Sequence, residues 1–162
     1  MRRGSLRRAR LEDAPLLNDL ARHAYADYVP LIGRRPQPMA VDWATLIDDH
    51  EIWIMAPARN GAIASLALKL KPDHVLIWSV AVMPEHQHRG LGRQLLSFAE
   101  ERAVALGRPE IRLFTNARMT RNLEIYRRLG YDEVEREARE DRVLVHMRKR
   151  LKPRNGRRAP TA

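Results

Sequence analysis

The stretch MPEHQHRGLGR (83–93) stands directly between an apolar run, VLIWSVAV (75–82), and a helical pattern, QLLSFAEERAVAL (94–106). A proline ends the extended segment, two glycines lie two residues apart, and the helical pattern begins at once. The first turn of a helix offers unpaired N–H groups and a partial positive charge, which together bind anions. Gly90 and Gly92 let the backbone approach a bulky anion closely, so the stretch predicts a phosphate or pyrophosphate site.

Two common phosphate-binding motifs do not match this stretch. A dinucleotide-binding loop requires a third glycine three residues after Gly92, where the chain has Leu95. A P-loop requires Gly-Lys followed by Ser or Thr, and this combination is absent. The remaining pattern is Gln-x-x-Gly-x-Gly, which starts at Gln87, and Arg89 and Arg93 add positive charge to it.

Hydrophobic periodicity predicts one α/β domain over residues 1–151. Strands are expected at 5–10, 51–56, 62–70, 75–83, 110–116, 131–137 and 142–150, and helices at 12–28, 43–50, 91–106 and 119–129. The segment 29–42, rich in Pro, Gly and Arg, is expected to be a long functional loop. The order β-α-α-β-β-β-α-β-α-β-β predicts a mixed, mostly antiparallel sheet flanked by helices. Strands 75–83 and 110–116 should be locally parallel because a helix connects them.

Two connecting segments have their own signals. Asn60-Gly61 predicts a tight turn between neighbouring strands. Residues 152–162 combine Pro, Gly and like charges and predict a basic, disordered C-terminal tail.

Composition excludes several classes of protein. The chain has no cysteine, which excludes disulfides, cysteine-ligated zinc and a thiol nucleophile. Its apolar runs are too short to span a membrane, and its N-terminus lacks the apolar core of a secretory signal, so we expect a cytoplasmic protein. His86 and His88 lie beside the glycines but lack a third ligand, and we predict no metal site.

The net charge of +10 comes from the two ends of the chain. Residues 1–10 and 148–162 hold twelve of the thirty basic residues and no acid, which leaves the body nearly neutral. This distribution favours non-specific attraction to polyanions over a nucleic-acid-binding groove.

Four segments in succession resemble one family. The strand VLIWSVAVM, the turn PEHQHRGLGRQLL, the strand EIRLFTN and the helix NLEIYRRLGY are similar to the GNAT superfamily of acetyl-CoA-dependent N-acetyltransferases. The resemblance covers residues 5–151 in element order and is sharpest over 75–131. It implies that the turn holds the CoA pyrophosphate through backbone N–H groups of Gln87, His88, Arg89, Gly90, Leu91, Gly92 and Arg93. It also implies that Ala81 and Val82 pair with the pantetheine arm and that Asn122 and Tyr126 contact the cofactor.

The implied reaction is direct attack of a neutral amine on the acetyl thioester. It requires an oxyanion donor and a proton for the departing thiolate. The backbone N–H of Val82 is the oxyanion candidate, although its strand can equally be the buried centre of the sheet. Tyr126 is the general-acid candidate, and its alternative role is in the apolar stripe of its helix. Asn122, one turn earlier on the same face, has a surface or capping role as its alternative.

The acceptor site has fewer signals. Many relatives carry a carboxylate on the strand before the turn, to draw a proton from the amine, but residues 75–83 contain no acid, so the base is not identified. The first helix, the following loop and the strand supply the candidate wall: Tyr25, Tyr28, Arg34, Arg35 and Ser79. Two arginines there would suit an acceptor with a carboxylate or phosphate.

Two functions from different classes therefore compete. The first is an N-acetyltransferase acting on a primary amine of a small molecule or peptide, with acetyl-CoA as cosubstrate. The second is an RNA- or polyanion-binding module on a degenerate acyltransferase fold, which only the basic ends support. Membranes are not expected partners, and a homodimer is left open.

Overall fold

Seven strands form one mixed sheet in the order β1-β2-β3-β4-β5-β7-β6. The computed structural model describes residues 5–57 and 61–153 of the chain. The strands are β1 (Leu6–Arg8), β2 (Glu51–Met55), β3 (Ala64–Leu70), β4 (Val75–Val82), β5 (Glu110–Asn116), β6 (Asp132–Arg139) and β7 (Arg142–Arg150). Among the described residues, β4 and β5 are the only parallel neighbours, which confirms the predicted mixed sheet and its parallel pair.

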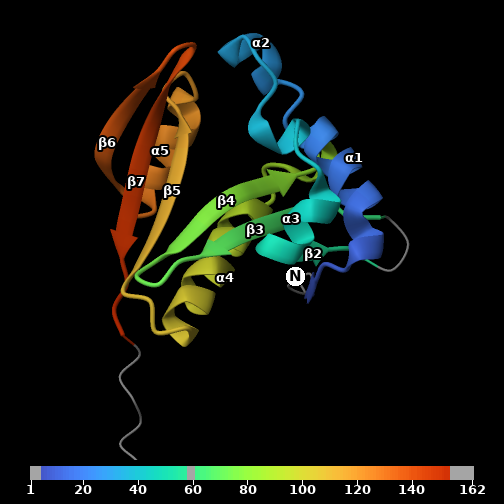
Figure 1. Ribbon diagram of the computed structural model, residues 1–162, viewed down its shortest axis with the longest axis horizontal. Coiled ribbons are helices and arrows are strands. Elements are labelled where there is room, and N and C mark those ends of the chain that lie inside the picture. Colours follow the sequence, from blue (N-terminus) through green and yellow to red (C-terminus); the bar gives the residue numbers. More distant parts are fainter. Residues whose placement is uncertain (1–4, 58–60, 154–162) are drawn as a thin grey trace, which may run out of the picture.

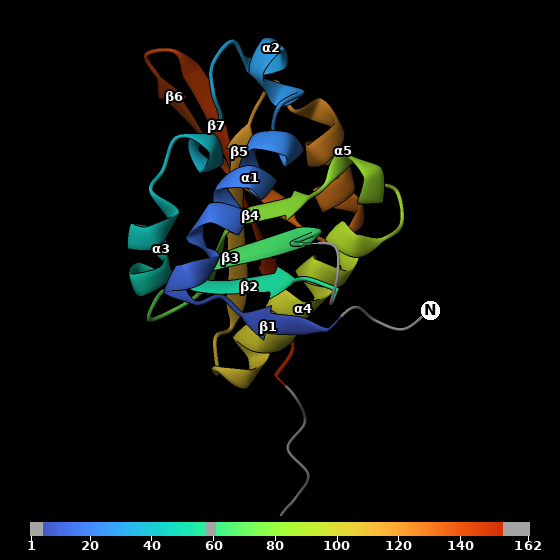
Figure 2. The same cartoon turned by 90° about the vertical axis from the view of Figure 1, so that its right-hand side faces the viewer.

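Helices cover both faces of this sheet. They are α1 (Ala14–Ala24), α2 (Tyr28–Ile32), α3 (Trp43–Asp49), α4 (Leu91–Ala105) and α5 (Thr120–Arg128), with 3₁₀ turns at Leu11–Asp13, Gln37–Met39 and Pro84–His86. The helices α1 and α3 lie on one face of β2 to β4 and α4 lies on the other (Figures 1 and 2).

Because side chains alternate between the two faces of each strand, the core lies in two layers, one on each face of the sheet. On β2, Ile52 and Ile54 pack with α1 and α3, whereas Trp53 points to the opposite face and contacts Phe98 of α4 at a centroid distance of 4.8 Å. Burying a large apolar side chain contributes about 1.5–3 kcal/mol, so both layers stabilise the sheet that carries the site.

A bulge in β4 divides the sheet into two halves. Ala67 of β3 pairs with Ser79, and Leu68 pairs with Ile77, which leaves Trp78 as the extra residue. Pairing between β4 and β5 also stops at Ile77, while β5 pairs with β7 along its whole length. A bulge bends its strand, so β4 leaves β5 at this point and the two halves diverge, as Figure 1 shows.

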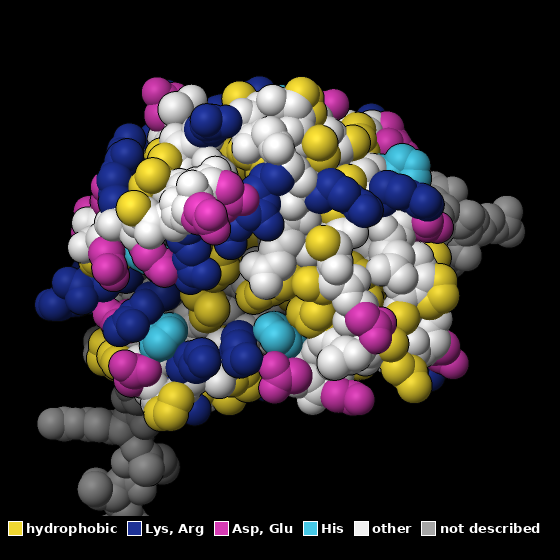
Figure 3. All heavy atoms as spheres, turned by 45° about the horizontal axis from the view of Figure 1, so that its top comes forward, with side chains coloured by type: hydrophobic (Ala, Val, Ile, Leu, Met, Phe, Trp, Pro, Cys, Tyr) yellow, Lys and Arg dark blue, Asp and Glu magenta, His cyan; other side chains and the backbone are white. Residues whose placement is uncertain are grey.

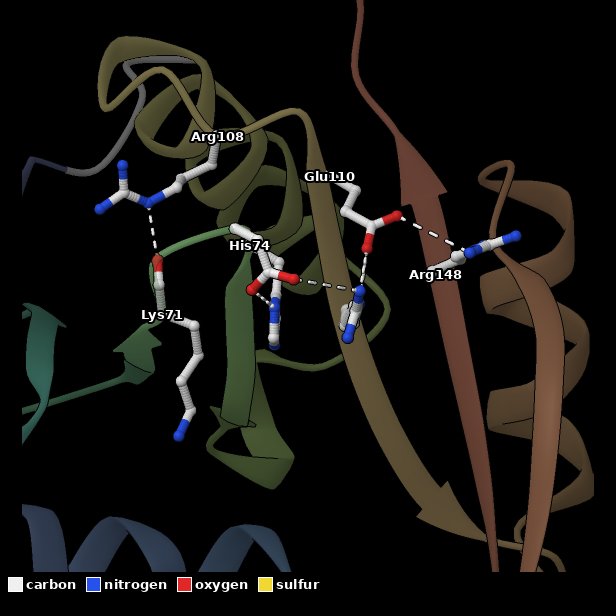
Figure 4. A network of polar contacts seen from close by, with 7 residues as sticks. Lys71, His74, Arg108, Glu110 and Arg148 are labelled. Atoms are coloured by element: carbon white, nitrogen blue, oxygen red, sulfur yellow. Dashed lines mark hydrogen bonds and ion pairs between the residues drawn. The ribbon is translucent and has the colours of Figure 1, made fainter.

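The opposite end of β4 and β5 is held closed by a polar network (Figure 4). Arg108, after α4, donates to the carbonyl of Lys71 at 2.7 Å. Arg112 of β5 pairs with Glu110 and reaches Asp73, before β4, at 3.7 Å. The network joins the turn before β4 to β5, so the two strands separate at one end only.

The first predicted helix is wrong at its end. It was expected over 12–28, but α1 ends at Ala24, and α2 occupies the start of the segment expected to be a loop. Gly33 adopts a left-handed φ of 73° that ends α2, and Ile32 of α2 is buried. Asn60 and residues 154–162 lie outside the described residues, so the predicted Asn60-Gly61 turn and most of the predicted tail stay predictions.

Candidate active site

A cavity of about 930 Å³ occupies the opening between the diverging halves of the sheet. Its walls come from α1, α2 and the following loop, β4, the turn before α4, β5, α5 and the β6–β7 hairpin. Every predicted site residue except Arg89 and Arg93 lines it. The cavity therefore joins parts of the chain that the sequence analysis had assigned to different roles.

The start of α4, beside this cavity, has N–H groups without a helical partner. Gln94 N–H donates to the carbonyl of Gly90 at 3.0 Å as the first bond of the helix, so the N–H groups of the three residues between them have no helical partner. His88 and Gly90 adopt left-handed φ values of 62° and 79°. Gln87 Nε2 donates to the carbonyl of Val82 at 3.1 Å, which ties the turn to the end of β4.

A Cβ built on either Gly90 or Gly92 would meet no atom within 4 Å, but Gly92, unlike Gly90, does not have a left-handed φ. The fold thus does not require glycine at this position. An open cradle beside unpaired N–H groups fits a diphosphate, which is the part of CoA that this turn would hold.

Beyond the bulge, the edge of β4 that faced β5 no longer pairs with that strand. Met83 N–H donates to the carbonyl of Ile63 on the β3 side at 2.9 Å. Antiparallel strands alternate the direction of their peptide groups, so Ala81 also faces β3, whereas Val80 and Val82 face the cavity. The carbonyls of Val80 and Val82 accept bonds from Tyr25 and Gln87 there. The N–H and C=O groups of Ala81 are therefore used toward β3, whereas those of Val80 and Val82 are directed into the cavity.

Tyr126 and Asn122 project from α5 into the same cavity. The ring of Tyr126 packs against Tyr131 at a centroid distance of 6.0 Å, and its hydroxyl has no hydrogen-bond partner among the described residues. Burial raises the pKa of Tyr126 above its usual value near 10, so the hydroxyl keeps its proton. The Tyr28 hydroxyl lies 3.5 Å from Asn122 Oδ1, which brings a predicted acceptor-site residue next to a predicted cofactor contact.

Tyr25 connects α1 to the bulged part of β4. Its hydroxyl donates to the carbonyl of Val80 at 2.9 Å and lies 2.8 Å from Ser79 Oγ. Because the phenol has one proton, Ser79 donates in the second bond. Burial raises the pKa of Tyr25 to about 12, so this residue stays neutral and serves to position β4.

The wall predicted to bind the acceptor is basic. Arg34 and Arg35 line the cavity as predicted, and the structure adds Lys69, Arg139 and Arg142, which the sequence analysis missed. Spacing could not reveal the last two, because they come from a hairpin more than a hundred residues away. Among the described residues, no Asp or Glu lines the cavity. Basic side chains border the hollow on this face of the molecule (Figure 3).

His50, to which the sequence analysis assigned nothing, also lies in the wall. Its side chain is 8% exposed and packs edge-on against Trp78. Nδ1 lies 3.5 Å from Asp49 Oδ2, and neither ring nitrogen has a hydrogen-bond partner among the described residues. Burial lowers the pKa of His50 below its usual value. The imidazole is therefore a neutral part of the wall.

Comparison with known proteins decides the family. A family model described as "Acetyltransferase (GNAT) family" matches residues 17–131, which include the turn, the diverging strands and α5. The chain belongs to the GNAT family of acetyltransferases. It is an acyltransferase, and acetyl-CoA is its cosubstrate. A search of curated proteins found no significant match.

Solved GNAT structures share the fold along almost the whole chain. The ribosomal-protein-S18-alanine N-acetyltransferase from Escherichia coli has a TM-score of 0.76 and 16% identity, covering 97% of this chain and 99% of that one. PaiA N-acetyltransferase from Thermoplasma acidophilum, in complex with coenzyme A, has a TM-score of 0.72 and 19% identity, covering 91% and 98%. A GNAT family acetyltransferase from Elizabethkingia anophelis with acetyl-CoA bound has a TM-score of 0.68 and 16% identity, covering 91% and 97%. Identities this low establish the fold alone.

No helix in residues 5–57 and 61–153 is long and apolar enough to cross a membrane. The same residues contain no group of three or more His, Cys, Asp or Glu side chains that could hold a metal ion.

Proposed function

We propose that this protein transfers the acetyl group of acetyl-CoA directly to a primary amine of a small molecule or peptide. One observation carries the proposal: a single cavity connects the N-terminal turn of α4, the Tyr126 hydroxyl and the basic acceptor side. Gly90, Gly92, Asn122 and Tyr126 all line it, which supports an enzyme over a polyanion-binding module.

The chain supplies three chemical functions in this proposal. The free N–H groups at the start of α4 bind the diphosphate, and those of Val80 and Val82 contact the pantetheine arm. The N–H of Val82 is the donor proposed for the oxyanion. Tyr126 donates to the leaving sulfur as its bond to the acetyl carbon breaks.

The pKa of the tyrosine relative to that of the leaving thiol determines how Tyr126 acts. A thiol has an ordinary pKa of about 8.5, below that of a tyrosine, so complete transfer of the tyrosine proton to a free thiolate is unfavourable. Burial of Tyr126 widens this difference. We therefore propose that Tyr126 donates a hydrogen bond to the sulfur in the transition state and keeps its own proton. Overall, the amine loses one proton and the departing thiolate gains one, so the reaction balances.

Loss of that amine proton is the step without a dedicated base. No carboxylate among the described residues lines the cavity, and nearby cations disfavour an ammonium group. An α-amine, with a pKa of about 7.7–8.0, is partly neutral at pH 7, whereas a lysine-like amine near 10.4 is not. We propose a preference for α-amines.

The test is thiol release from acetyl-CoA with acceptors that differ in amine pKa, over pH 6 to 9. The proposal expects acceptor-dependent release with a rate that rises with pH and follows the pKa of each amine. A plateau at one pH for every amine would reveal a dedicated base, and no amine-dependent release from an enzyme that binds acetyl-CoA would contradict direct transfer.

The remaining sequence-based expectations belong to the same proposal. We propose that residues 1–151 carry the activity, so a chain ending at Leu151 should keep its turnover. A cytoplasmic location and a homodimer stay predictions.

A further inference from the structure

Two walls of the cavity, the loop after α2 and the tip of the β6–β7 hairpin, contact each other. Arg34, in the loop after α2, forms an ion pair with Asp141, at the tip of the β6–β7 hairpin, at 2.5 Å. Their chain neighbours Arg35 and Arg142 also line the cavity. Arg35 and Arg142 therefore line the cavity from two walls that the Arg34–Asp141 ion pair joins.

Basic side chains outnumber acidic ones around this contact. Asp141 is shared between Arg34 and Arg142, and its contact with Arg142 is long, at 3.4 Å. Arg35 donates to the carbonyl of Met39 at 3.0 Å and makes no ion pair among the described residues. The cavity thus has two guanidinium groups whose donors are largely unused.

The neighbouring acids are engaged as well. Glu137 of β6 pairs with Arg139 at 2.8 Å and with His146 at 2.9 Å, and it does not line the cavity. Trp78, Phe114 and Leu144 line the same cavity, so apolar side chains lie among the basic ones. An acceptor bound there meets both apolar surface and positive charge.

We propose that the acceptor carries an anionic group, a carboxylate or a phosphate, that binds between Arg35 and Arg142. The inference rests on the proposed function and names the class of its acceptor. Guanidinium groups bind both kinds of anion through paired N–H donors, so the shared chemistry is an oxyanion on the same molecule as the amine. Polyamines and lysine-rich peptides are disfavoured, because their extra positive charges meet the same arginines.

The experiment compares matched amines with acetyl-CoA saturating. One arm pairs O-phosphoethanolamine with ethanolamine, and the other pairs phenylalanine with phenethylamine. A hydrogen bond to a charged group corresponds to about a 10- to 100-fold effect, so kcat/KM for the anionic member should be at least about tenfold higher in one arm or both. The arm that shows the difference identifies phosphate or carboxylate.

Variants show whether the arginines cause the preference. Arg35→Gln and Arg142→Gln should each lower kcat/KM for the anionic member about tenfold or more and leave the neutral member within about threefold. The matched control is Arg136→Gln on β6, whose register partner Val145 belongs to the opposite face of the hairpin from Leu144. This control should keep the preference.

Binding decides the outcome if no member of the panel is acetylated. The acidic members are then titrated calorimetrically into the enzyme saturated with CoA, so that the turn before α4 is filled. Binding by the wild type that weakens in Arg35→Gln and Arg142→Gln supports the proposal. No binding of any anionic member, equal use of neutral members, or a preference that survives both substitutions would overturn it. Failure to bind acetyl-CoA would instead remove the proposed function.

Discussion

The hydroxyl of Tyr25 donates a hydrogen bond to the carbonyl oxygen of Val80 at 2.9 Å, and this bond joins α1 to the free side of β4. The carbonyl would otherwise point into the cavity without a partner, because β4 has already separated from β5 at this level. A residue from the acceptor side thus fixes the backbone that is proposed to bind the cofactor. The two halves of the site depend on one another through this contact.

Tyr25→Phe should loosen this connection without removing the ring. The substitution leaves the Val80 carbonyl and the Ser79 hydroxyl without their partner, so the free energy of unfolding should fall by about 1–3 kcal/mol. Urea unfolding measures the change. Tyr28→Phe is the control, because its hydroxyl makes only a 3.5 Å contact with Asn122, and it should lose less than about 0.5 kcal/mol. Equal losses in the two variants would contradict the anchoring role of Tyr25.

Tyr126→Phe removes the proposed donor to the leaving sulfur and keeps the ring that packs on Tyr131. Turnover should fall by about 10²- to 10³-fold, as for the loss of one transition-state hydrogen-bond donor, with affinity for acetyl-CoA little changed. Because the pKa of Tyr126 is raised, its ionisation should cause no loss of rate below about pH 10 in the wild type.

The control for this prediction is Tyr131→Phe. The Tyr131 hydroxyl donates to Glu100 Oε1 at 3.3 Å on the core side, so its removal should affect stability and leave turnover nearly unchanged. If Tyr126→Phe instead loses cofactor affinity while keeping its turnover per bound cofactor, Tyr126 is a packing residue.

His50 should make stability depend on pH. Its pKa is lowered in the folded state by burial and also by Lys69 and Lys71, while Asp49 opposes the shift. The unfolded chain, with an ordinary histidine pKa of about 6.5, therefore binds the proton first as the pH falls. The contribution of a neutral His50 to stability is complete above pH 6.5 and is lost below it.

His50→Phe removes this titration and keeps a ring against Trp78. The free energy of unfolding of the wild type relative to the variant should fall by up to about 1.4 kcal/mol per pH unit below 6.5, measured by urea unfolding between pH 7.5 and 5.5. Parallel pH profiles for the two proteins would show that His50 is not held neutral by the fold.

The sequence predicts those cavity-lining residues that local chemistry marks. The turn from Gln87 to Gly92 is recognisable because backbone anion binding requires glycines at a helix start, and Asn122 and Tyr126 share a helix face by their spacing. The bulge at Trp78 has no such signal, since it arises from pairing with β3. Arg139 and Arg142 reach the cavity through the tertiary position of the hairpin, which no local pattern encodes.

The break between α1 and α2 was missed for a related reason. Leu16 to Tyr28 continues a helical apolar pattern, and propensity alone favours one helix. The structure instead ends α1 before Tyr25, whose hydroxyl binds Val80 and Ser79 on β4. A tertiary hydrogen bond therefore accompanies a boundary that the local pattern does not mark.

Calorimetric titration of acetyl-CoA into the wild type and Gly92→Val tests the central claim, that the N-terminal turn of α4 holds the cofactor through its backbone. A Cβ at residue 92 meets no atom within 4 Å and needs no unusual φ, so the variant should keep its stability within about 1 kcal/mol. The added side chain should block close approach and weaken binding at least about tenfold, with Gly92→Ala between the two. Wild-type affinity in a fully folded Gly92→Val protein would contradict the claim.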